Sequence, residues 1–528
     1  MGISRIRVVV VVSSLLSILV LSNISLATSA ASVNENFLEC LSLQKTPIPI
    51  PTYSPNNFSY STIFNSSARN LRFLSPTSEK PRFVITPLHE SHVQAAVVCC
   101  KKHHLELKVR SGGHDLEGLS YTSETPFVIA DLVNYRNISI NVEDKSAWIQ
   151  AGAQLGEVYY RIAEKSKTLG FPAGFCPTVG VGGHISGGGF GGLVRKYGLA
   201  SDQVIDARMV DANGNILDKE SMGEDLFWAI RGGGASNFGV ILSWKVKLVP
   251  VTPNVTVAIV DKTLEQGATS LVYKWQQIAD KLHEDLYISP TMSTVNASRG
   301  GQRTVLVQFS ILFLGGIDRL LQLTQQSFPE LGLQRKDCTE MSWVESHVYF
   351  YARGRPLELL LDRDHVTKSF LKVKTDYVKE PISITGLEGI WRKFLEGDAP
   401  VMLWTPFGAR MNEISESESP YPHRAGNMFN IMYIANWQDD RESQKHIDWI
   451  RRFYSYMGSY VSKFPRAAYL NYKDLDLGEH RYGPLINSLT ARNWGNKYFK
   501  SNFERLVYVK SKVDPSNFFK NKQSIPTF

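Results

Sequence analysis

The sequence predicts an α+β protein made of two units. Its 528 residues exceed the size at which a single hydrophobic core stops growing, so more than one domain is expected. Residues 78–252 combine short strand and helix patterns with two glycine-dense turns, and Pro250 and Pro253 mark the end of this unit. Residues 256–463 carry longer strand and helix patterns, which predict a sheet covered on one side by helices.

The first unit is predicted to begin with a strand at residues 81–86 and a helix over 90–103, after a helix and a loop within 32–75. Residues 105–110 alternate as a strand does and lead directly into the first glycine turn. The remaining elements follow in order: strands at 127–132 and 147–151, a helix over 155–168 that Gly170 ends, and strands at 203–210 and 240–249.

The second unit is predicted from strand patterns at residues 304–313 and 428–437 and from a helical pattern over 317–328. Near the end of the chain, helical patterns lie around residues 492–495 and over 499–513. The sequence contains no internal repeat and no low-complexity tract.

The N-terminus has the features of a secretory signal peptide over residues 1–30. A basic start is followed by an apolar run over residues 8–21 and then by small residues up to Ala31. This run is shorter than the ~20 residues that a membrane span requires, so a secreted protein without a membrane anchor is expected, in the cell wall, the extracellular space or the vacuole. Five Asn-x-Ser/Thr sequons then become candidate N-glycosylation sites: Asn57, Asn65, Asn137, Asn254 and Asn296.

Charge and cysteine content limit the partners. The formal net charge is +8, but lysine and arginine are dispersed without a basic tract, and secretion also argues against a nucleic-acid partner.

Five cysteines are an odd number for an oxidising compartment, so one thiol needs another role. Cys40 could form a disulfide with Cys99 or with Cys100, and the sequence alone does not choose between them.

Two glycine-dense turns, residues 110–115 and 174–189, each carry a reactive side chain. Glycine lets backbone N–H groups approach a ligand closely, so such turns form nests for phosphate and other polar ligand edges. Neither turn is the Gly-x-Gly-x-x-Gly unit of dinucleotide-binding folds, and no P-loop lysine follows them.

Two other kinds of site were considered for these turns. A metal site at His114, Cys176 and His184 would lack the paired short spacings of structural zinc, so no metal is expected. A cysteine–histidine hydrolase is disfavoured because Pro177 follows Cys176 at once, whereas a helix N-terminus usually stabilises a reactive thiolate.

The two turns resemble those of the berberine bridge enzyme-like FAD-linked oxidases of plants, in the vanillyl-alcohol oxidase superfamily. Residues 110–114 resemble the loop whose histidine bonds covalently to a methyl group of the flavin, and residues 174–180 the loop whose cysteine bonds to the adjacent ring carbon. The resemblance runs from about residue 35 to 526 and includes residues 37–41 and 514–519.

This resemblance implies FAD held bicovalently through His114 and Cys176, and a disulfide between Cys40 and Cys99. It also implies a PCMH-type FAD-binding domain formed by residues 31–77, 78–252 and 466–528, with a substrate domain over 253–465 inserted between them. A monomer is expected. Two covalent bonds would withdraw electron density from the flavin and raise its redox potential.

The resemblance also implies roles for individual residues. Tyr472 would act as the catalytic base, although a phenol titrates near ~10 in water and needs a nearby cation or donor for this task. Tyr197 would be a second phenol in the pocket, and Val179 would leave oxygen access to the flavin. The cofactor-binding residues would be Arg110, Ser111, Gly112, Gly113, His114, Cys176, Val179, Gly180, Gly183, His184, Gly187, Gly188, Gly189, Val240 and Asn471.

The sequence departs from the family pattern at the pocket. The strand at 428–434 has Asn430 and Met432 where many relatives present a glutamate or glutamine, and Leu116 replaces a tyrosine. An apolar pocket with one phenol base favours a phenolic substrate, including a prenylated one, over a sugar or an ammonium-bearing alkaloid. The predicted activity is hydride transfer to FAD, with oxidation or oxidative cyclisation of the substrate and release of hydrogen peroxide.

Two alternatives to this oxidase stay open. One is a non-redox pericyclase on the same scaffold, in which FAD is structural. The other is a secreted binding protein with little activity, which is less favoured because His114, Cys176 and Tyr472 are all present.

Overall fold

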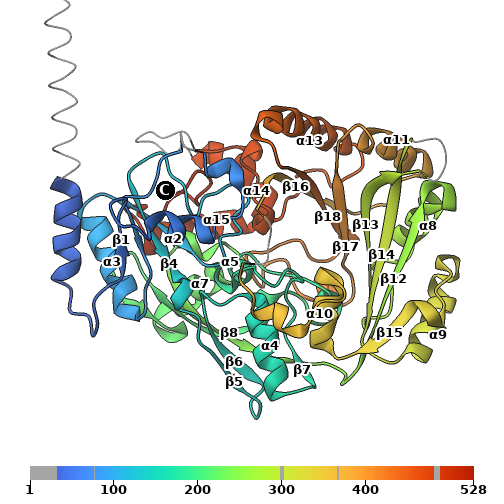
Figure 1. Ribbon diagram of the computed structural model, residues 1–528, viewed down its shortest axis with the longest axis horizontal. Coiled ribbons are helices and arrows are strands. Elements are labelled where there is room, and N and C mark those ends of the chain that lie inside the picture. Colours follow the sequence, from blue (N-terminus) through green and yellow to red (C-terminus); the bar gives the residue numbers. More distant parts are fainter. Residues whose placement is uncertain (1–31, 76–77, 298–301, 365–367, 481–487) are drawn as a thin grey trace, which may run out of the picture.

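The computed structural model describes residues 32–75, 78–297, 302–364, 368–480 and 488–528, so the predicted signal peptide lies outside the described part. Two units lie side by side (Figure 1). The first unit contains the elements of residues 32–250 together with α14 (Ser488–Phe499) and α15 (Asn502–Val513), and the second contains a large sheet with its helices. The predicted α+β class is confirmed.

A four-stranded sheet of the first unit carries the first glycine turn. Its order is β1 (Thr52–Tyr53), β2 (Phe83–Ile85), β4 (Phe127–Asp131) and β3 (Glu106–Arg110), and β4 pairs in parallel with both β2 and β3. The helix α3 (Glu90–Lys102) connects β2 to β3 and buries Val93, Ala96, Val97 and Cys100, as its spacing predicts. The turn therefore begins where a buried parallel strand ends.

The second turn packs against a five-stranded antiparallel sheet. Its order is β5 (Ile138–Asn141), β6 (Ser146–Gln150), β10 (Val240–Lys247), β8 (Val204–Val210) and β9 (Ile216–Leu217). The short helix α5 (Val181–Ser186) lies within the second turn and contacts β6 and β10. The predicted helix over 155–168 is too long: α4 (Leu155–Lys165) ends earlier because β7 (Leu169–Gly170) pairs with β11 (Val249–Pro250).

The second unit is a seven-stranded antiparallel sheet. Its order is β15 (Cys338–Met341), β12 (Val255–Thr263), β14 (Arg303–Phe313), β13 (Leu286–Asn296), β17 (Val401–Pro406), β18 (Phe429–Trp437) and β16 (Phe370–Val378). The helices α8 (Ala268–Ile278), α9 (Ile317–Ser327), α11 (Ile384–Phe394) and α13 (Ser443–Met457) share one hydrophobic core with one face of this sheet (Figure 1). The opposite face turns toward the first unit.

The other helices of the two units are α2 (Tyr60–Ser66), α6 (Val194–Tyr197), α7 (Lys219–Ile230), α10 (Trp343–Ala352) and α12 (Arg410–Glu413). The C-terminal helix α15 contacts α7, and its buried Lys510 donates hydrogen bonds to the carbonyl oxygens of Asn237 and Phe519. The last residues of the chain thus complete the first unit, as the resemblance implies.

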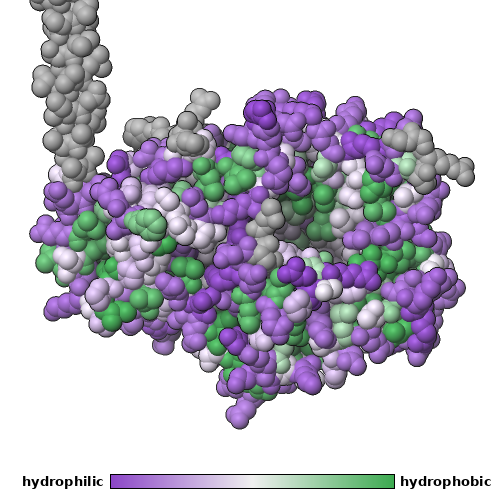
Figure 2. All heavy atoms as spheres, viewed as in Figure 1, coloured by the Kyte–Doolittle hydropathy of each residue, from purple (hydrophilic) through white to green (hydrophobic). Residues whose placement is uncertain are grey.

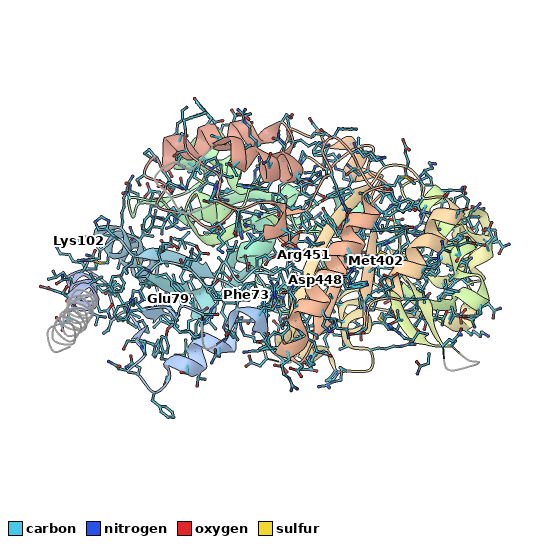
Figure 3. All side chains as sticks on the ribbon, turned by 90° about the horizontal axis from the view of Figure 1, so that it is seen from above. Phe73, Glu79, Lys102, Met402, Asp448 and Arg451 are labelled. Atoms are coloured by element: carbon cyan, nitrogen blue, oxygen red, sulfur yellow. A yellow bond between two sulfur atoms is a disulfide. The ribbon has the colours of Figure 1, made fainter. Side chains whose placement is uncertain are left out.

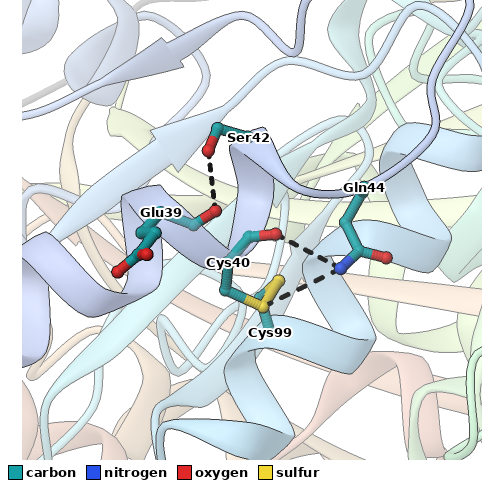
Figure 4. The surroundings of a disulfide bond; sticks show 5 residues. All are labelled: Glu39, Cys40, Ser42, Gln44 and Cys99. Atoms are coloured by element: carbon teal, nitrogen blue, oxygen red, sulfur yellow. Dashed lines mark hydrogen bonds between the residues drawn. A yellow bond between two sulfur atoms is a disulfide. The ribbon is translucent and has the colours of Figure 1, made fainter.

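A disulfide joins Cys40, in the helical residues 32–42, to Cys99 of α3 (Figure 4). Gln44 Nε2 donates to the carbonyl oxygen of Cys40 beside this bond. The pairing with Cys99 is confirmed. Cys100 is buried with a free thiol, and Cys176 and Cys338 are also unpaired.

The asparagines of all five sequons are exposed, so their glycosylation stays a prediction that the surface permits. Within the described ranges, the helices are all too short or too polar to cross a membrane.

Arg110 forms a buried ion pair with Asp131. Its Nη2 lies 2.7 Å from Asp131 Oδ2, and its other bonds go to the carbonyl oxygens of Ile63 and Phe64. The guanidinium is therefore directed into the protein, away from the glycine turn. The Arg110 side chain lies outside the cavity lining and anchors the strand before the turn, so a cofactor-binding role for Arg110 stays a prediction that its side-chain contacts do not support.

Replacing Asp131 by alanine is expected to lower the free energy of unfolding by about 3–5 kcal/mol, because the Arg110 charge would stay buried without its partner. Urea denaturation measures this loss. Asp439→Ala, which removes an ion pair with Arg441 at the surface, is the matched control and should leave the midpoint unchanged. Equal midpoints for the two variants would contradict the structural role of the buried pair.

Candidate active site

A cavity of about 600 Å³ lies at the junction of the two units. The space-filling view is hollowed between the first unit and the sheet (Figure 2). The structure brings most of the residues that were predicted from sequence to this one cavity: Ser111, Gly112, Gly113, His114, Cys176, Val179, Gly180, Gly183, His184, Asn471 and Tyr472.

The two glycine turns pack directly against each other. A Cβ atom on Gly112 would lie 2.3 Å from the backbone nitrogen of Gly180, so only glycine permits this approach. Ser111 Oγ donates to the carbonyl oxygen of Ala151, which fixes the first turn to the end of β6. His114 and Cys176 thereby reach the same wall of the cavity from segments far apart in the sequence.

Thr178 connects the two reactive side chains. Its hydroxyl oxygen lies 2.9 Å from His114 Nε2 and 3.7 Å from Cys176 Sγ, and the residue is fully buried. Because Nε2 is engaged, Nδ1 is the ring nitrogen of His114 that remains for a bond to a ligand. The sequence placed both reactive residues at the site but gave no role to the threonine between them.

Burial keeps these groups neutral. It lowers the pKa of His114 to about 3, with a further contribution from the positive charge of Arg69. Burial also raises the pKa of the Cys176 thiol, although its hydrogen bond with Thr178 acts in the opposite direction. A neutral imidazole keeps a lone pair free for bonding, whereas a hydrolase would need a Cys176 thiolate paired with a base.

His184 acts through its position in the second turn. Its Nε2 accepts a hydrogen bond from the backbone N–H of Gly174 at 3.1 Å, and burial lowers its pKa to about 4. Its carbonyl oxygen accepts from Asn471 Nδ2 at 2.9 Å. These bonds tie the C-terminal segment to the turn that carries Cys176. Across the described residues, no cluster of three or more histidine, cysteine or acidic side chains could hold a metal ion.

Several predicted cofactor residues do not line the cavity. Gly187 packs against the Asn471 side chain, and the N–H of Gly189 donates to the Tyr469 hydroxyl, so the run 187–189 supports the site from behind. Val240 is also absent from the lining, because successive side chains of β10 point to opposite faces and its neighbour Ile241 faces the cavity.

The structure adds a third glycine turn that the sequence interpretation missed. Gly234, Ala235 and Ser236 line the cavity between α7 and β10. The run Gly232–Gly234 and the following small residues were a usable signal, because they share the composition of the two recognised turns.

The two predicted phenols differ in position. Tyr472 lies in the 3-10 helix Leu470–Tyr472 and lines the cavity, and its pKa is raised by burial and then by Tyr469, Tyr287 and Cys176. It is therefore a neutral phenol. Tyr197 ends α6 and donates to the carbonyl oxygen of Pro250 outside the cavity lining. The prediction that Tyr197 belongs to the pocket is wrong, because the chain turns at Gly198 and directs this ring toward β11.

The wall opposite the glycine turns is largely apolar. Leu403 and Thr405 of β17 and Met432 of β18 face the cavity, and Leu116 joins them from the first unit. Among the described sheet residues in the lining, none carries a carboxylate. Asn430 is turned into the protein, where its Nδ2 donates to Thr375 Oγ1 and to the carbonyl oxygen of Asp376.

This arrangement fits FAD. Close backbone contacts on one wall and apolar side chains on the other suit a flat ring system with polar edges. A Cβ atom built on Gly183 would meet no protein atom within 4 Å, so the turn leaves open space at this position. His114 and Cys176 would lie at the ring, and the backbone of Ser111, Gly112 and Gly180 would hold it.

Family models match two parts of the chain. Residues 81–219 match the FAD binding domain, and residues 468–526 match the berberine and berberine like domain. The two matched stretches meet in the first unit. Together they define a flavoprotein whose FAD-binding domain is formed by parts far apart in the sequence.

Whole-chain relatives specify the family. A tetrahydroberberine oxidase of Argemone mexicana is 69% identical over 520 residues, which are 97% of this chain and 96% of that protein. A monolignol oxidoreductase of Arabidopsis thaliana is 51% identical over 525 residues, with 97% of each chain covered. The chain belongs to the berberine bridge enzyme-like family, and it is an FAD-linked oxidoreductase that uses oxygen as its acceptor.

Solved structures agree with this assignment. Phl p 4, a grass pollen allergen with glucose dehydrogenase activity, has a TM-score of 0.88 at 43% identity and covers 93% of this chain and 99% of its own. A cysteine-to-alanine variant of berberine bridge enzyme also has a TM-score of 0.88, at 38% identity, with 93% of this chain and 100% of its own covered. The predicted PCMH-type fold is therefore confirmed.

Gly183→Val is expected to give a folded protein that loads flavin poorly, because its side chain would enter the space at the second turn. Overpacking of this kind costs roughly 1–3 kcal/mol, which corresponds to about 10–100-fold in affinity. The ratio of flavin to protein absorbance measures the loss, and circular dichroism checks the fold. Gly316→Val, outside the cavity, is the control and should load normally. Normal loading of Gly183→Val would place the cofactor elsewhere.

Proposed function

We propose that this protein is an oxidase of polycyclic tertiary amines of the tetrahydroberberine type, with FAD joined covalently to His114 and Cys176. The observation that carries the proposal is the substrate wall of Leu116, Leu403 and Met432, apolar and without a carboxylate. The 69% identity to a tetrahydroberberine oxidase supports this substrate class. It takes precedence over the phenolic substrate expected from sequence.

The reacting form of such an amine is the free base. Its nitrogen lone pair stabilises the cation that is left when a hydride departs from the neighbouring carbon. The sheet wall, which has no carboxylate, gives no ion-pair partner to the protonated amine. Asp115 and Lys473 line other parts of the cavity; burial lowers the pKa of Lys473 and the charge of Asp115 opposes this, so the two side chains offset each other. The sheet wall therefore favours the free base, and no side chain needs to remove a proton before the hydride leaves.

FAD, when bound, takes two electrons as hydride from the substrate and passes them to oxygen, which gives hydrogen peroxide. The side chains of the cavity orient the substrate and exclude water. Phe350 and Tyr351 of α10 and Tyr287 of β13 enclose the substrate side with aromatic surface. Tyr472, as a neutral phenol, donates a hydrogen bond or packs against the substrate and does not act as a phenolate base.

A phenolic substrate is the second candidate, because a monolignol oxidoreductase is 51% identical and Tyr472 faces the cavity. The test mixes the anaerobic protein with tetrahydroberberine, coniferyl alcohol or glucose and follows the flavin absorbance. Reduction by tetrahydroberberine, followed by one peroxide per hydride on admission of air, supports the proposal. Reduction by coniferyl alcohol alone would favour the phenolic candidate.

Two further outcomes bear on the alternatives. Reduction by glucose alone would overturn both substrate classes. Product formation without oxygen uptake would support the non-redox pericyclase, which the oxidase names of close relatives do not favour.

We also propose entry into the secretory pathway with glycans on the five sequons. The exposed asparagines and the disulfide in an apolar core region support this proposal. When the full chain is expressed in plant cells, endoglycosidase treatment should lower its apparent mass. An unchanged mass would contradict glycosylation.

A further inference from the structure

A buried cluster of charged side chains lies where three segments meet behind the cavity. Lys372 and Lys374 stand on β16 of the sheet, and Asp474 follows Tyr472 in the C-terminal segment. Each lysine and Asp474 has a side chain only 2% exposed. Lys372 Nζ lies 2.7 Å from Asp474 Oδ1, and Lys374 Nζ lies 2.6 Å from Asp474 Oδ2.

Lys372 makes a second contact that Lys374 does not make. Its ammonium donates to Glu117 Oε1, in the loop that follows His114, and Glu117 is also buried. Lys374 lies 2.7 Å from Asp476 Oδ2, which is 3.6 Å from Lys372, and also lies over the Tyr454 ring of α13. Lys372 thus joins the substrate sheet, the loop after His114 and the segment after Tyr472, whereas the contacts of Lys374 do not include the loop after His114.

We propose that Lys372 is a positioning residue that holds the His114 turn and Tyr472 in register with the substrate sheet. The proposal rests on the proposed function, because it assigns to Lys372 the alignment of the flavin attachment site with the substrate wall. Lys372 touches neither flavin nor substrate in this scheme. It acts on the His114 turn through Glu117 and on Tyr472 through Asp474.

The loop after His114 needs such an anchor. Residues 114–118 form neither helix nor strand, so side-chain bonds determine their place. Asp115 Oδ1 accepts from the N–H of Glu117 and of Leu119, and Asn70 Nδ2 donates to the carbonyl oxygen of Leu116. The Asp115 bonds shape the loop within the first unit, whereas Asn70 Nδ2 also donates to the carbonyl oxygen of Leu371 on β16. The contact of Glu117 with Lys372 adds a charged side-chain link from the loop to the same strand.

Charge makes this contact specific. Burial lowers the pKa of Lys372, but the carboxylates of Asp474, Glu117 and Asp476 outweigh it, so the pKa is raised and the lysine stays charged. Burial raises the pKa of Glu117, and the charge of Lys372 is the largest influence in the opposite direction. Buried ion pairs seldom stabilise a fold more than well-packed apolar groups of the same volume would. A charged junction is instead directional, because each ammonium hydrogen bond fixes one donor and one acceptor.

The junction also extends to the outer helix of the sheet. Asp476 accepts two hydrogen bonds from Arg451 of α13, at 3.0 and 2.6 Å. The strand β16 contacts both α13 and the 3-10 helix Leu71–Phe73, the elements that carry Arg451 and Phe73 in Figure 3. Arg72 Nη1, in that 3-10 helix, lies 3.8 Å from Glu117 Oε2. The cluster therefore lies at the boundary between the two units.

The test compares Lys372→Met with Lys374→Met, which removes an equally buried charge from the same strand. Peptide mass spectrometry after proteolysis gives the fraction of flavin joined to His114, and steady-state kinetics separate kcat from KM. Lys372→Met should lower the His114-linked fraction and kcat, each by about 10–100-fold, because misplacement of reacting groups by about an ångström can cost about 100-fold. Lys374→Met should keep the linked fraction of the wild type.

Two more variants make the outcome decisive. Glu117→Gln removes only the carboxylate in the loop after His114 and should reproduce the loss of His114-linked flavin. Lys372→Arg, which keeps the positive charge, should retain at least half of the His114-linked fraction of the wild type. Equal losses in Lys372→Met and Lys374→Met, or normal linkage in Glu117→Gln, would overturn the proposal. If Lys372→Met does not fold, Glu117→Gln and Lys372→Arg still decide it. A wild-type protein without flavin on His114 would instead overturn the proposed function.

Discussion

Replacing both His114 and Cys176 by alanine is expected to release the flavin into the supernatant on acid precipitation, whereas each single variant should keep yellow colour in the pellet. Both side chains line the same wall, and Thr178 lies between them. Either bond alone is enough to retain the cofactor in a denatured chain. Loss of each bond should lower kcat about tenfold, which equals about 1.4 kcal/mol of activation barrier.

The physical reason lies in the electronic effect and in the placement of the ring. A covalent bond to the flavin withdraws electron density and makes hydride acceptance more favourable. Attachment would also hold the ring at the wall that carries His114 and Cys176, so that less orientational freedom is lost when the substrate binds. Rapid-reaction kinetics should show the loss in the reductive step, with a smaller change in substrate affinity.

Cys338→Ala is the matched control for the cysteine variant. Cys338 is also a free, half-buried thiol, but it lies on the edge strand β15 outside the cavity lining. This variant should keep both the colour in the pellet and kcat of the wild type. Flavin wholly in the supernatant of the wild type would contradict covalent attachment, and flavin retained by the double variant would point to a third attachment residue.

The sequence could predict the two glycine turns because their composition reports directly on backbone geometry. Gly112 and Gly180 are required by a close contact between backbones, and the reactive residues stand beside them. Strands and helices with clear periodicity, such as α3 and β3, were also predictable. The contact between the turns depended on the family resemblance, because nothing local to residues 110–115 identifies residues 174–180 as their partner.

The predicted site residues that do not line the cavity share a physical cause, which is the direction of their side chains. Arg110, Val240 and Tyr197 lie next to cavity residues in the sequence, but their side chains point to Asp131, to the far face of β10 and to Pro250. A strand turns successive side chains to opposite faces, so a one-residue error moves a prediction from the cavity into the core.

The charged cluster was equally hidden from sequence reasoning. Glu117, Lys372 and Asp474 belong to three segments separated by more than a hundred residues, as shown by the spacing of the Lys372 contacts. Isolated charges in a soluble protein usually mark a solvated surface. Only the fold shows that these three are buried together.

Val179→Leu is expected to slow the reaction with oxygen about 100-fold and to leave flavin reduction by the substrate within about twofold of the wild type. The loss corresponds to about 2.7 kcal/mol of activation barrier. Val179 is half-buried and faces the cavity from the turn that carries Cys176, and its N–H donates to the carbonyl oxygen of Cys176. A larger side chain there would fill the space through which oxygen reaches the flavin.

A structural relative gives this expectation an independent basis. Wild-type Phl p 4 is described as a glucose dehydrogenase, whereas its variant with isoleucine replaced by valine is described as a glucose oxidase. The smaller side chain thus accompanies reactivity with oxygen in that protein. Enlargement of Val179 tests whether the size of one aliphatic side chain has the same effect in this chain.

Two half-reactions measured separately decide the role of Val179. Anaerobic stopped-flow mixing gives the rate of flavin reduction, and mixing of the reduced protein with buffers of known oxygen content gives the rate of reoxidation. Val109→Leu adds the same carbon at another half-buried position of the cavity lining and should change neither rate more than about twofold, since small hydrophobic changes with room to repack cost little. Equal slowing of both half-reactions in Val179→Leu would mean that this residue positions the flavin. Selective slowing of reoxidation would mean that it controls the access of oxygen.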